Sequence, residues 1–421
     1  MGFLEKQGSW SLSFAGSGYL GLYHVGVIHC LSRHAPHLIQ GADRFYGSSA
    51  GALGAISIIS SKSVDFCCSS VMAMVKHVEG LSLGIFHPAY APIEYIRQRL
   101  RDTLPEDCHI LASQRLGISL THWPDGHNVI VTDFATKEEL IQATICTLFL
   151  PLYCGTIPPE FRGERYMDGA LSNSMPFASS PSTITISPYH GTGDICPQSP
   201  SASLHELNAF HASFQICTSN FYLGWMSLFP PKPEVVADIS RQGYLDAHRF
   251  LEQRGLIKEL VLWTLVSKER PAPAKGGDGE FNWDVPHLRV KDVPDFERVA
   301  PELEAALKKA CQRDSGAWAR FRHSGPGWAL TYLLLPWSLP FEYIYYRSRR
   351  LALWLPEAPT DLRWVWGLMK GTANGVFCRM KAGLSLPAAS ARDTGSHQPR
   401  AAGTELRSAH PACRGPGSSL P

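Results

Sequence analysis

The stretch "RFYGSSAGALGA", Arg44–Ala55, places a serine among small residues, between a strand-like run and a helix-like run. Its core, Gly47–Gly51, has the pattern G-x-S-x-G. That pattern is typical of a nucleophile elbow, in which a strained strand-to-helix turn exposes a serine hydroxyl. Glycine and serine also form ordinary turns, so the rest of the chain has to separate a catalytic Ser49 from a plain turn.

Composition limits the class of protein. The chain has 421 residues, of which 44% are apolar and 18% charged, so it can bury a large core. A net charge of +2 gives no reason to expect nucleic acid as a partner. The eleven cysteines show no CxxC pair and no metal-ligand spacing, which favours reduced thiols inside the cell. The first residues lack the apolar run of a secretory signal, and Lys6 breaks the myristoylation pattern, so we expect a cytoplasmic protein that is not secreted.

Strand-like and helix-like runs alternate from Trp10 to about Pro188, which favours a layered α/β domain. Within it, "GISLTHW" and "NVIVTDF" indicate two strands joined by a turn, and a helix capped by Thr136 follows. We therefore divide the chain into a catalytic domain at 10–188, an extension with a linker at 189–324, an apolar aromatic segment at 325–384 and a disordered tail at 385–421.

A second glycine-rich loop precedes the serine turn. "GSGYLG", Gly16–Gly21, has the pattern G-x-G-x-x-G after a strand and before a helix, which is the context of a dinucleotide-binding loop. Asp43 lies at about the expected distance for such a site, but it precedes its strand instead of closing it. If the two strands are neighbours, the amides of Gly16, Ser17 and Gly18 can point at an oxyanion beside the serine. One site then explains both loops, so we favour an oxyanion hole over a nucleotide site or a mere turn.

The serine hydroxyl needs a neighbouring group to accept its proton. Asp168 and Gly169 end the strand-like run "RYMDGAL", although Asp-Gly pairs also form simple turns. The histidines that could complete a triad carry no motif; they are His190, His205, His211, His248, His287 and His323. His190 follows a strand and is the best placed of them. The residues alone leave both a Ser-Asp pair and a triad open.

Three motifs follow one another along the chain: the glycine-rich loop, G-x-S-x-G at Gly47–Gly51, and Asp-Gly-Ala at Asp168–Ala170. This order resembles the patatin-like phospholipase family, most of all its animal branch with adiponutrin and adipose triglyceride lipase, and the resemblance extends to about residue 384. It implies a patatin-like three-layer α/β/α sandwich with a C-terminal, partly helical, lipid-associating extension. It also implies hydrolysis of lipid acyl esters by a Ser-Asp dyad without a histidine, and without a metal or cofactor.

The resemblance assigns roles to residues. Ser49 would be the nucleophile and Asp168 the general base, and the oxyanion hole and turn supports would be Gly16, Ser17, Gly18, Gly21, Gly47, Gly51 and Gly169. Plant and bacterial members of the family carry a third glycine and a basic residue in the first loop, where this chain has Ser17 and Leu20. The missing positive charge favours neutral glycerides such as triacylglycerol over anionic phospholipids.

The segment 325–384 is rich in tryptophan, tyrosine and arginine, the composition of a membrane interface. Its run "GWALTYLLLPWSLPF" is too short to span a bilayer, and Pro336 and Pro340 interrupt it. We expect a non-spanning hairpin at the surface of a lipid droplet, with the arginines Arg347, Arg349 and Arg350 facing headgroup phosphates. A hairpin buried in the core is the alternative.

The sequence thus predicts a triacylglycerol lipase that acts in lipid degradation at a lipid-droplet or membrane surface, with neutral lipid as its partner. Two other functions stay open. One is an acylglycerol transacylase, because transfer to a glyceride passes through the same acyl-enzyme. The other is a droplet-bound scaffold whose dyad is weak or vestigial.

Overall fold

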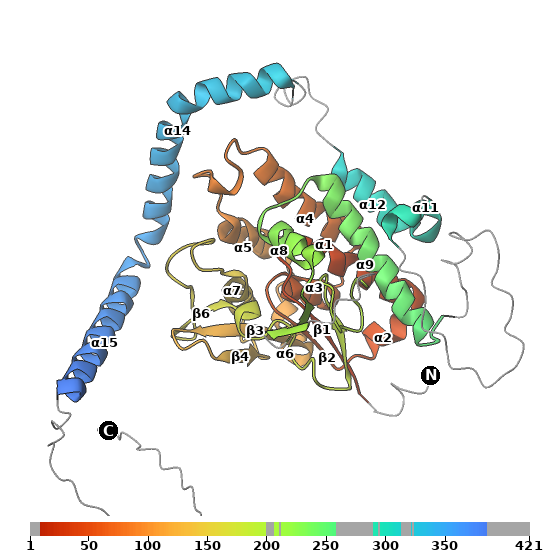
Figure 1. Cartoon of the computed structure of the whole chain (residues 1–421), viewed down its shortest axis with the longest axis horizontal. Helices are drawn as coiled ribbons and strands as arrows, with labels where there is room; N and C mark the ends of the chain where they lie inside the picture. The colour runs from red at the N-terminus through yellow and green to blue at the C-terminus, as the bar shows by residue number, and fades with distance from the viewer. Residues whose placement is uncertain are drawn as a thin grey trace, which may run out of the picture. The chain divides into compact units, whose positions relative to one another are not determined.

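The structure, a computed structural model, describes residues 9–198, 206–209, 212–257, 289–293, 295–312, 321 and 324–384. The chain divides into two compact units, Met1–Pro356 and Glu357–Pro421. The linker expected within 189–324 lies mostly outside the described residues, and the tail at 385–421 lies wholly outside them. Figure 1 shows the described elements by label.

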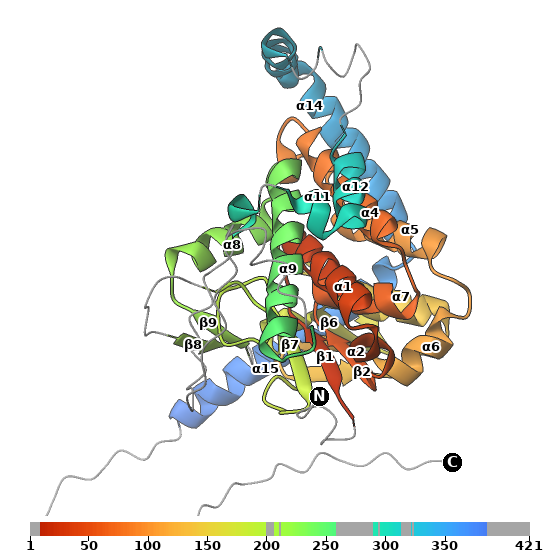
Figure 2. The same cartoon turned by 90° about the vertical axis from the view of Figure 1, so that its right-hand side faces the viewer.

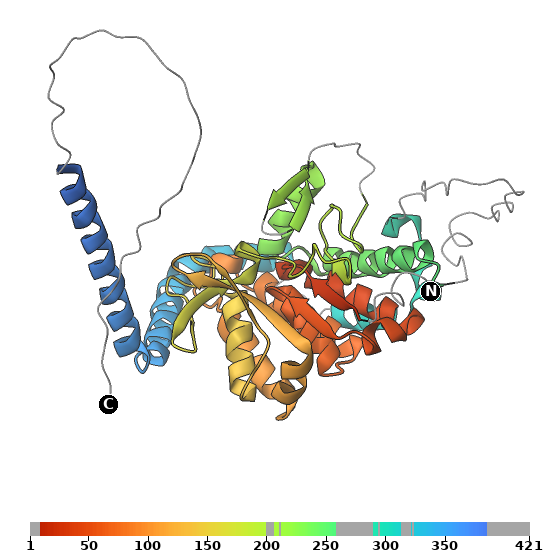
Figure 3. The same ribbon diagram turned by 90° about the horizontal axis from the view of Figure 1, so that it is seen from below.

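A mixed sheet forms the centre of the first unit. Its strands are β1 (Ser11–Phe14), β2 (Arg44–Gly47), β3 (Leu116–Trp123), β4 (Asn128–Val131), β5 (Glu160–Phe161), β6 (Glu164–Asp168) and β7 (Thr183–Ile186). Their order is β5-β6-β3-β2-β1-β7, and β4 pairs with β3 off this path. β1 lies parallel to β2 and β7, and β2 lies parallel to β3, whereas β4 and β6 run antiparallel to β3. The hairpin of β8 (Glu206–Ala209) and β9 (Ala212–Gln215) stays outside this sheet (Figure 3).

Helices surround the sheet. In the first unit they are α1 (Leu22–His34), α2 (Pro36–Gln40), α3 (Ala50–Ile59), α4 (Val64–Glu79), α5 (Pro92–Thr103), α6 (Cys108–Arg115), α7 (Lys137–Leu148), α8 (Thr218–Leu228), α9 (Pro233–Gln253), α11 (Phe296–Val299), α12 (Pro301–Cys311) and α14 (Gly325–Trp354). Short 3-10 turns lie at η1 (Gly18–Gly21), η2 (Gly84–Phe86), η3 (Gly169–Leu171) and η4 (Val290–Asp292). The second unit contains α15 (Ala358–Leu384). This layered arrangement confirms the predicted α/β/α fold class and its helical C-terminal extension.

Local sequence signals explain several of these elements. β3 and β4 form the predicted hairpin, with Ile118 opposite Val131. Thr136 caps α7, as predicted, and its Oγ1 accepts a hydrogen bond of 3.1 Å from the amide of Glu139. Capping of this kind satisfies one of the amides that a helix leaves without a partner at its start.

Elements beyond residue 188 complete the same core as β1. α9 lies along α1 (Figure 2), and the buried Tyr23 hydroxyl of α1 donates a hydrogen bond of 2.8 Å to the buried carboxylate of Asp246 in α9. α12 packs against α4, and its Leu307 belongs to the same hydrophobic cluster as Leu12 and Phe14 of the sheet. The catalytic domain therefore depends on helices from the segment that the sequence suggests is an extension.

α14 is one helix of 30 residues that continues through Pro336 and Pro340, so the expected hairpin is absent. A proline inside a helix loses its own amide bond, and its ring crowds the carbonyl four residues earlier, which favours a kink. Contacts with the rest of the unit hold α14 on both sides of this stretch. No helix in the described part of the chain is both long and apolar enough to cross a bilayer.

Polar contacts from Tyr332, Glu342 and Arg350 of α14 reach one segment between α4 and α5, residues 82–90. The Tyr332 hydroxyl donates to the carbonyl of Ser82 at 3.3 Å, and Glu342 lies 2.9 Å from His87 Nε2. The guanidinium of Arg350 donates to the carbonyls of Pro88, at 2.8 Å, and Tyr90. Arg350 therefore binds the protein itself, whereas the sequence groups it with two arginines for lipid phosphate.

We expect Arg350→Ala to loosen α14 from the 82–90 segment. A hydrogen bond from a charged donor contributes about 1.5 kcal/mol or more, so amide exchange in both elements should accelerate about tenfold. Hydrogen exchange read by mass spectrometry measures this change. Arg349→Ala, which alters an exposed neighbour on the same helix, is the matched control. Equal rates of amide exchange in Arg350→Ala and Arg349→Ala would contradict the view that Arg350 holds α14 to the 82–90 segment.

Candidate active site

Two strand registers place Ser49 and Asp168 at the same level of the sheet. β3 pairs in parallel with β2, where Gly47 lies opposite Ile118, and antiparallel with β6, where Leu120 lies opposite Asp168. Ser49 follows two residues after Gly47, so it reaches the level of Leu120 on the other side of β3. The sheet thus brings together two residues that are far apart in the sequence.

Ser49 occupies a strained turn between β2 and α3. Its backbone has φ 51° and ψ −127°, a region that residues other than glycine seldom adopt. Glycines on both sides make the turn sterically possible. A Cβ on Gly47 would lie 2.6 Å from the nitrogen of Ala52, and one on Gly51 would lie 2.3 Å from the carbonyl oxygen of Phe14. This geometry is that of a nucleophile elbow.

Thr147, near the end of α7, supports the turn from the neighbouring helix. The Ser49 amide donates to Thr147 Oγ1 at 2.9 Å, and that hydroxyl donates to the carbonyl of Ser119 in β3 at 2.7 Å. Both hydrogen bonds are buried, so they hold the elbow against the sheet. Sequence reasoning missed Thr147, because no motif marks a threonine inside a helix whose partner is 98 residues away.

Asp168 is buried at the end of β6, where its carboxylate has few partners. Its Oδ1 accepts a hydrogen bond of 2.8 Å from the amide of Ala170. Burial raises the pKa of Asp168 from 3.8 to about 6, although the amide of Ala170 and the nearby side chain of Ser49 oppose the rise. A carboxylate of this kind can accept a proton from a serine hydroxyl at neutral pH.

Ser174 joins the glycine-rich loop to the elbow. The amide of Gly16 donates to Ser174 Oγ at 3.3 Å, and the Ser48 hydroxyl donates to the carbonyl of Ser174 at 2.8 Å. Among the described residues we find no hydrogen-bond acceptor for the amides of Ser17 and Gly18. These two amides are therefore the ones in the loop that remain available to an oxyanion.

His24 fixes the same loop from α1. Its Nε2 lies 2.9 Å from the carbonyl of Ala15, to which it donates, and 3.2 Å from the hydroxyl of Ser17. Burial lowers the pKa of His24 to about 4, so the ring is neutral at physiological pH. The loop thus gains a rigid support that adds no positive charge.

One cavity of about 380 Å³ adjoins the elbow, Asp168 and the glycine-rich loop. Ser49, Asp168 and the amide-bearing residues Gly16–Gly18 line it, together with Gly21 at the end of η1. Gly169 begins η3 directly after Asp168. The remaining walls come largely from apolar side chains, so the cavity suits an apolar ligand.

Three tyrosines, which sequence reasoning also missed, connect the walls of this cavity. The hydroxyls of Tyr19 and Tyr90 lie 2.8 Å apart, as do those of Tyr90 and Tyr153, and Tyr153 donates to the carbonyl of Leu228 at 2.7 Å. Tyr19 directly follows Gly18. The chain of hydroxyls therefore ties the glycine-rich loop to three other parts of the unit.

The structure brings no histidine to the cavity within the described part of the chain. The backbone amide of His190 donates to Asn220 at 2.8 Å, and His248 is buried beside Glu252 of its own helix, with Nδ1 and Oε1 3.3 Å apart. The other four candidates, His205, His211, His287 and His323, lie outside the described residues.

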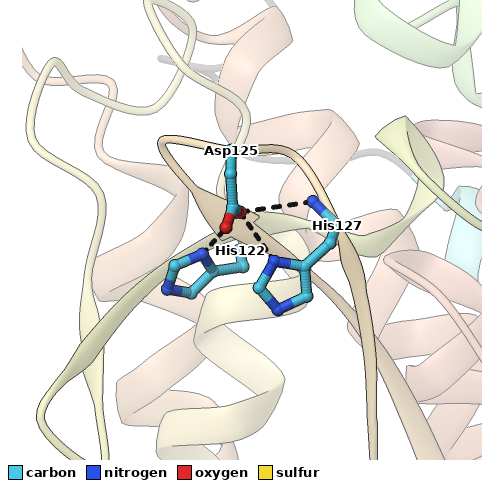
Figure 4. Close-up of side chains that lie close together, drawn as sticks. All are labelled: His122, Asp125 and His127. Carbon is cyan, nitrogen blue, oxygen red and sulfur yellow. Dashed lines mark hydrogen bonds and ion pairs between the residues drawn. The ribbon is translucent and has the colours of Figure 1, made fainter. Parts of the chain in front are cut away.

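One group elsewhere offers donors to a metal ion. His122 and His127 each place a ring Nδ1 at 2.6 and 2.7 Å from one oxygen of Asp125, on the β3–β4 turn (Figure 4). These hydrogen bonds by themselves account for the arrangement, and Asp125 and His127 are exposed. None of the three is among the described residues that line the cavity, so we assign the group no role.

Several known proteins are similar to this chain in sequence. The family described as "Patatin-like phospholipase" matches residues 12–179. The human protein named "Patatin-like phospholipase domain-containing protein 5" is 64% identical over 417 residues, which cover 96% of this chain and 97% of that protein. The rat "Patatin-like phospholipase domain-containing protein 2" is 38% identical, covering 86% and 75%. The human "1-acylglycerol-3-phosphate O-acyltransferase PNPLA3" is 35% identical, covering 90% and 84%. The chain therefore belongs to the patatin-like phospholipase family.

Proposed function

We propose that this protein is a lipid acyl hydrolase that cleaves neutral glycerides through an acyl-enzyme on Ser49. The observation that carries the proposal is that the strained Ser49 and the buried Asp168 line the same apolar cavity. Membership of the patatin-like phospholipase family supports the general class of lipid hydrolysis.

The reaction follows from the positions of these groups. Ser49 Oγ attacks the ester carbonyl while its proton passes to Asp168, and the alkoxide of the leaving glyceride then takes that proton. A water molecule gives a proton to Asp168 as it attacks the acyl-serine, and the fatty acid leaves as Ser49 regains its proton. The amides of Ser17 and Gly18, with the N-terminus of α3, stabilise the oxyanion in both steps.

The loop beside the elbow favours an uncharged substrate. Ser17 and Leu20 stand where plant and bacterial members have a glycine and a basic residue, and the buried His24 is neutral. An anionic headgroup would therefore meet no cation from this loop. We infer that triacylglycerol or another neutral glyceride is the substrate.

A transacylase is the second candidate, because one relative is named an acyltransferase. Product analysis with triolein and isotopically labelled monoolein separates the two. Free oleate supports the hydrolase, whereas label that moves into diacylglycerol without free oleate supports the transacylase. A scaffold with a vestigial dyad would give neither product.

The outer face of α14 supports association with a lipid surface. Apolar side chains recur on it every three or four residues, at Leu330, Leu333, Trp337, Phe341 and Ile344. Trp337 and Phe341 are 77% and 75% exposed. The opposite face carries the contacts with the 82–90 segment, so the apolar stripe points away from the protein. We propose that this stripe enters the phospholipid monolayer of a lipid droplet.

Ser49→Ala should abolish both ester hydrolysis and covalent labelling by a fluorophosphonate, because it removes the attacking oxygen. Ser48→Ala is the matched control, since it alters the adjacent serine and removes only a structural hydrogen bond to Ser174. We expect Ser48→Ala to keep its label. If Ser48→Ala loses the label and Ser49→Ala keeps it, the nucleophile is Ser48 and the assignment to Ser49 is wrong.

Activity should follow the ionisation of Asp168. Below about pH 6 this carboxyl is protonated and cannot accept the serine proton, so kcat/KM for a water-soluble ester should fall about tenfold per pH unit.

Asp168→Asn should lower kcat by a factor of roughly 10² to 10⁴, the usual contribution of a general base. His190→Ala should leave the profile intact. A triad would instead show itself as a large loss in His190→Ala with normal folding.

Replacement of Leu333, Trp337 and Phe341 by serine should reduce binding to triolein droplets coated with phosphatidylcholine at least tenfold, because each buried side chain contributes about 1.5 kcal/mol or more. Co-flotation with the droplets measures the bound fraction. Ser348→Ala, on the same helix, is the control. Undiminished flotation of a chain that ends at Ser324 would show that another surface binds the droplet.

A further inference from the structure

The cavity extends well beyond the reacting groups, along the whole length of α3. The residues of α3 that line it include Leu53 and Ser57, and Ser60 lines it just beyond the end of the helix. Their spacing of three or four positions places them on one face. The lining therefore begins at Ser49, at the N-terminus of α3, and follows the helix to its end. We call this part of the cavity the α3 groove.

α4 and α5 supply the other two walls of the α3 groove, again with one face each. On α4 the lining includes Val71 and Met74, and on α5 it includes Ile93 and Ile96. All four of these aliphatic side chains are only partly buried. Apolar surface left facing a cavity is unfavourable in water, so the groove suits a long aliphatic ligand.

The two ends of the α3 groove differ in chemistry. α5 begins close to Tyr90, whose hydroxyl contacts Tyr19 of the glycine-rich loop, so this end adjoins the reacting groups. α5 ends at Thr103, whose carbonyl accepts a hydrogen bond of 2.6 Å from Lys62 Nζ, just beyond α3. The groove therefore runs from the elbow to a distal end that carries a cation.

Phe66 and Arg99 line the distal end and contact each other. The Arg99 guanidinium lies 5.4 Å from the centre of the Phe66 ring, and its Nη2 is 3.5 Å from the hydroxyl of Ser70. Lys62 Nζ lies 5.3 Å from the same ring. Two cations around one aromatic ring mark the point at which apolar lining gives way to polar groups.

We propose that the α3 groove binds the acyl chain of the ester and that Phe66, Ser70 and Arg99 set the length of chain it accommodates. The proposal rests on the proposed hydrolysis at Ser49. α3 has 10 residues and is about 15 Å long. An extended alkyl chain advances about 1.25 Å per carbon, from a C–C bond of about 1.5 Å. An acyl group of about 12 carbons therefore fills the groove from the elbow to Arg99.

Chain-length dependence tests this assignment. We expect kcat/KM for p-nitrophenyl esters, presented in the same mixed micelles, to rise about fourfold per methylene from butanoyl towards dodecanoyl, equivalent to about 0.8 kcal/mol. From dodecanoyl to hexadecanoyl the values should level off, because the added carbons pass the cations and leave the groove. A constant value across the series would overturn the proposal.

Two adjacent serines of α4 give a matched pair of variants. Ser70 lines the α3 groove, whereas Ser69 is exposed and its hydroxyl donates to the Phe66 carbonyl of its own helix. Ser70→Trp should lower the ratio of dodecanoyl to butanoyl kcat/KM at least tenfold, and Ser69→Trp should leave that ratio unchanged. Arg99→Leu should act in the opposite direction, raising hexadecanoyl hydrolysis relative to dodecanoyl.

Labelling of Ser49 by a short-chain fluorophosphonate separates the possible failures. If Ser70→Trp and Ser69→Trp keep the label, hydrolyse butanoyl ester and share one chain-length profile, the α3 groove does not bind the acyl chain, and the proposed function stands. If the wild-type chain takes no label and cleaves no ester, the proposed function itself fails.

Discussion

Burial of a single ionisable carboxyl, Asp168, beside the Ser49 hydroxyl is the constraint on which the catalytic unit depends. Burial raises the pKa of Asp168 from 3.8 to about 6, so the folded state holds the proton more tightly than the unfolded chain does. Folding stability is therefore lost as the pH rises from about 4 to above 6. At about 1.4 kcal/mol per pKa unit, the ionised form costs about 3 kcal/mol. The unit bears this cost at neutral pH, where the carboxylate is ionised and would act as the base in the proposed reaction.

Ser49 adds a second cost, because its positive φ is strained. The Ser49 amide donates a hydrogen bond to Thr147 of α7, and the Ser48 hydroxyl donates one to the carbonyl of Ser174. These bonds can hold the turn only if the sheet beside it is rigid. That rigidity comes from a core shared by β1, α9 and α12. We infer that a fragment ending at residue 188 would lack the packing that keeps the elbow strained and Asp168 buried.

The sequence predicts the elements whose causes are local. Gly47 and Gly51 are required by contacts with residues close to the turn or on the adjacent strand, so their spacing is visible in the chain. Thr147 could not be predicted, because its role depends on a contact across 98 residues. The contact between the Tyr19 and Tyr90 hydroxyls spans 71 residues and leaves no local pattern. The composition of the segment also led to the wrong expectation that Arg350 faces lipid phosphate. In sequence, an arginine bound to backbone carbonyls cannot be told from one that faces lipid.

Tyr90 connects the two halves of the proposed mechanism. Its carbonyl accepts a hydrogen bond from Arg350 of α14, while its hydroxyl contacts Tyr19 next to the glycine-rich loop. The helix that we propose enters lipid and the loop that would stabilise the oxyanion are therefore linked through one residue. An effect of α14 on ester cleavage at Ser49 can be recognised only with a water-soluble ester. Hydrolysis of droplet lipid changes when either binding to the droplet or cleavage at Ser49 changes.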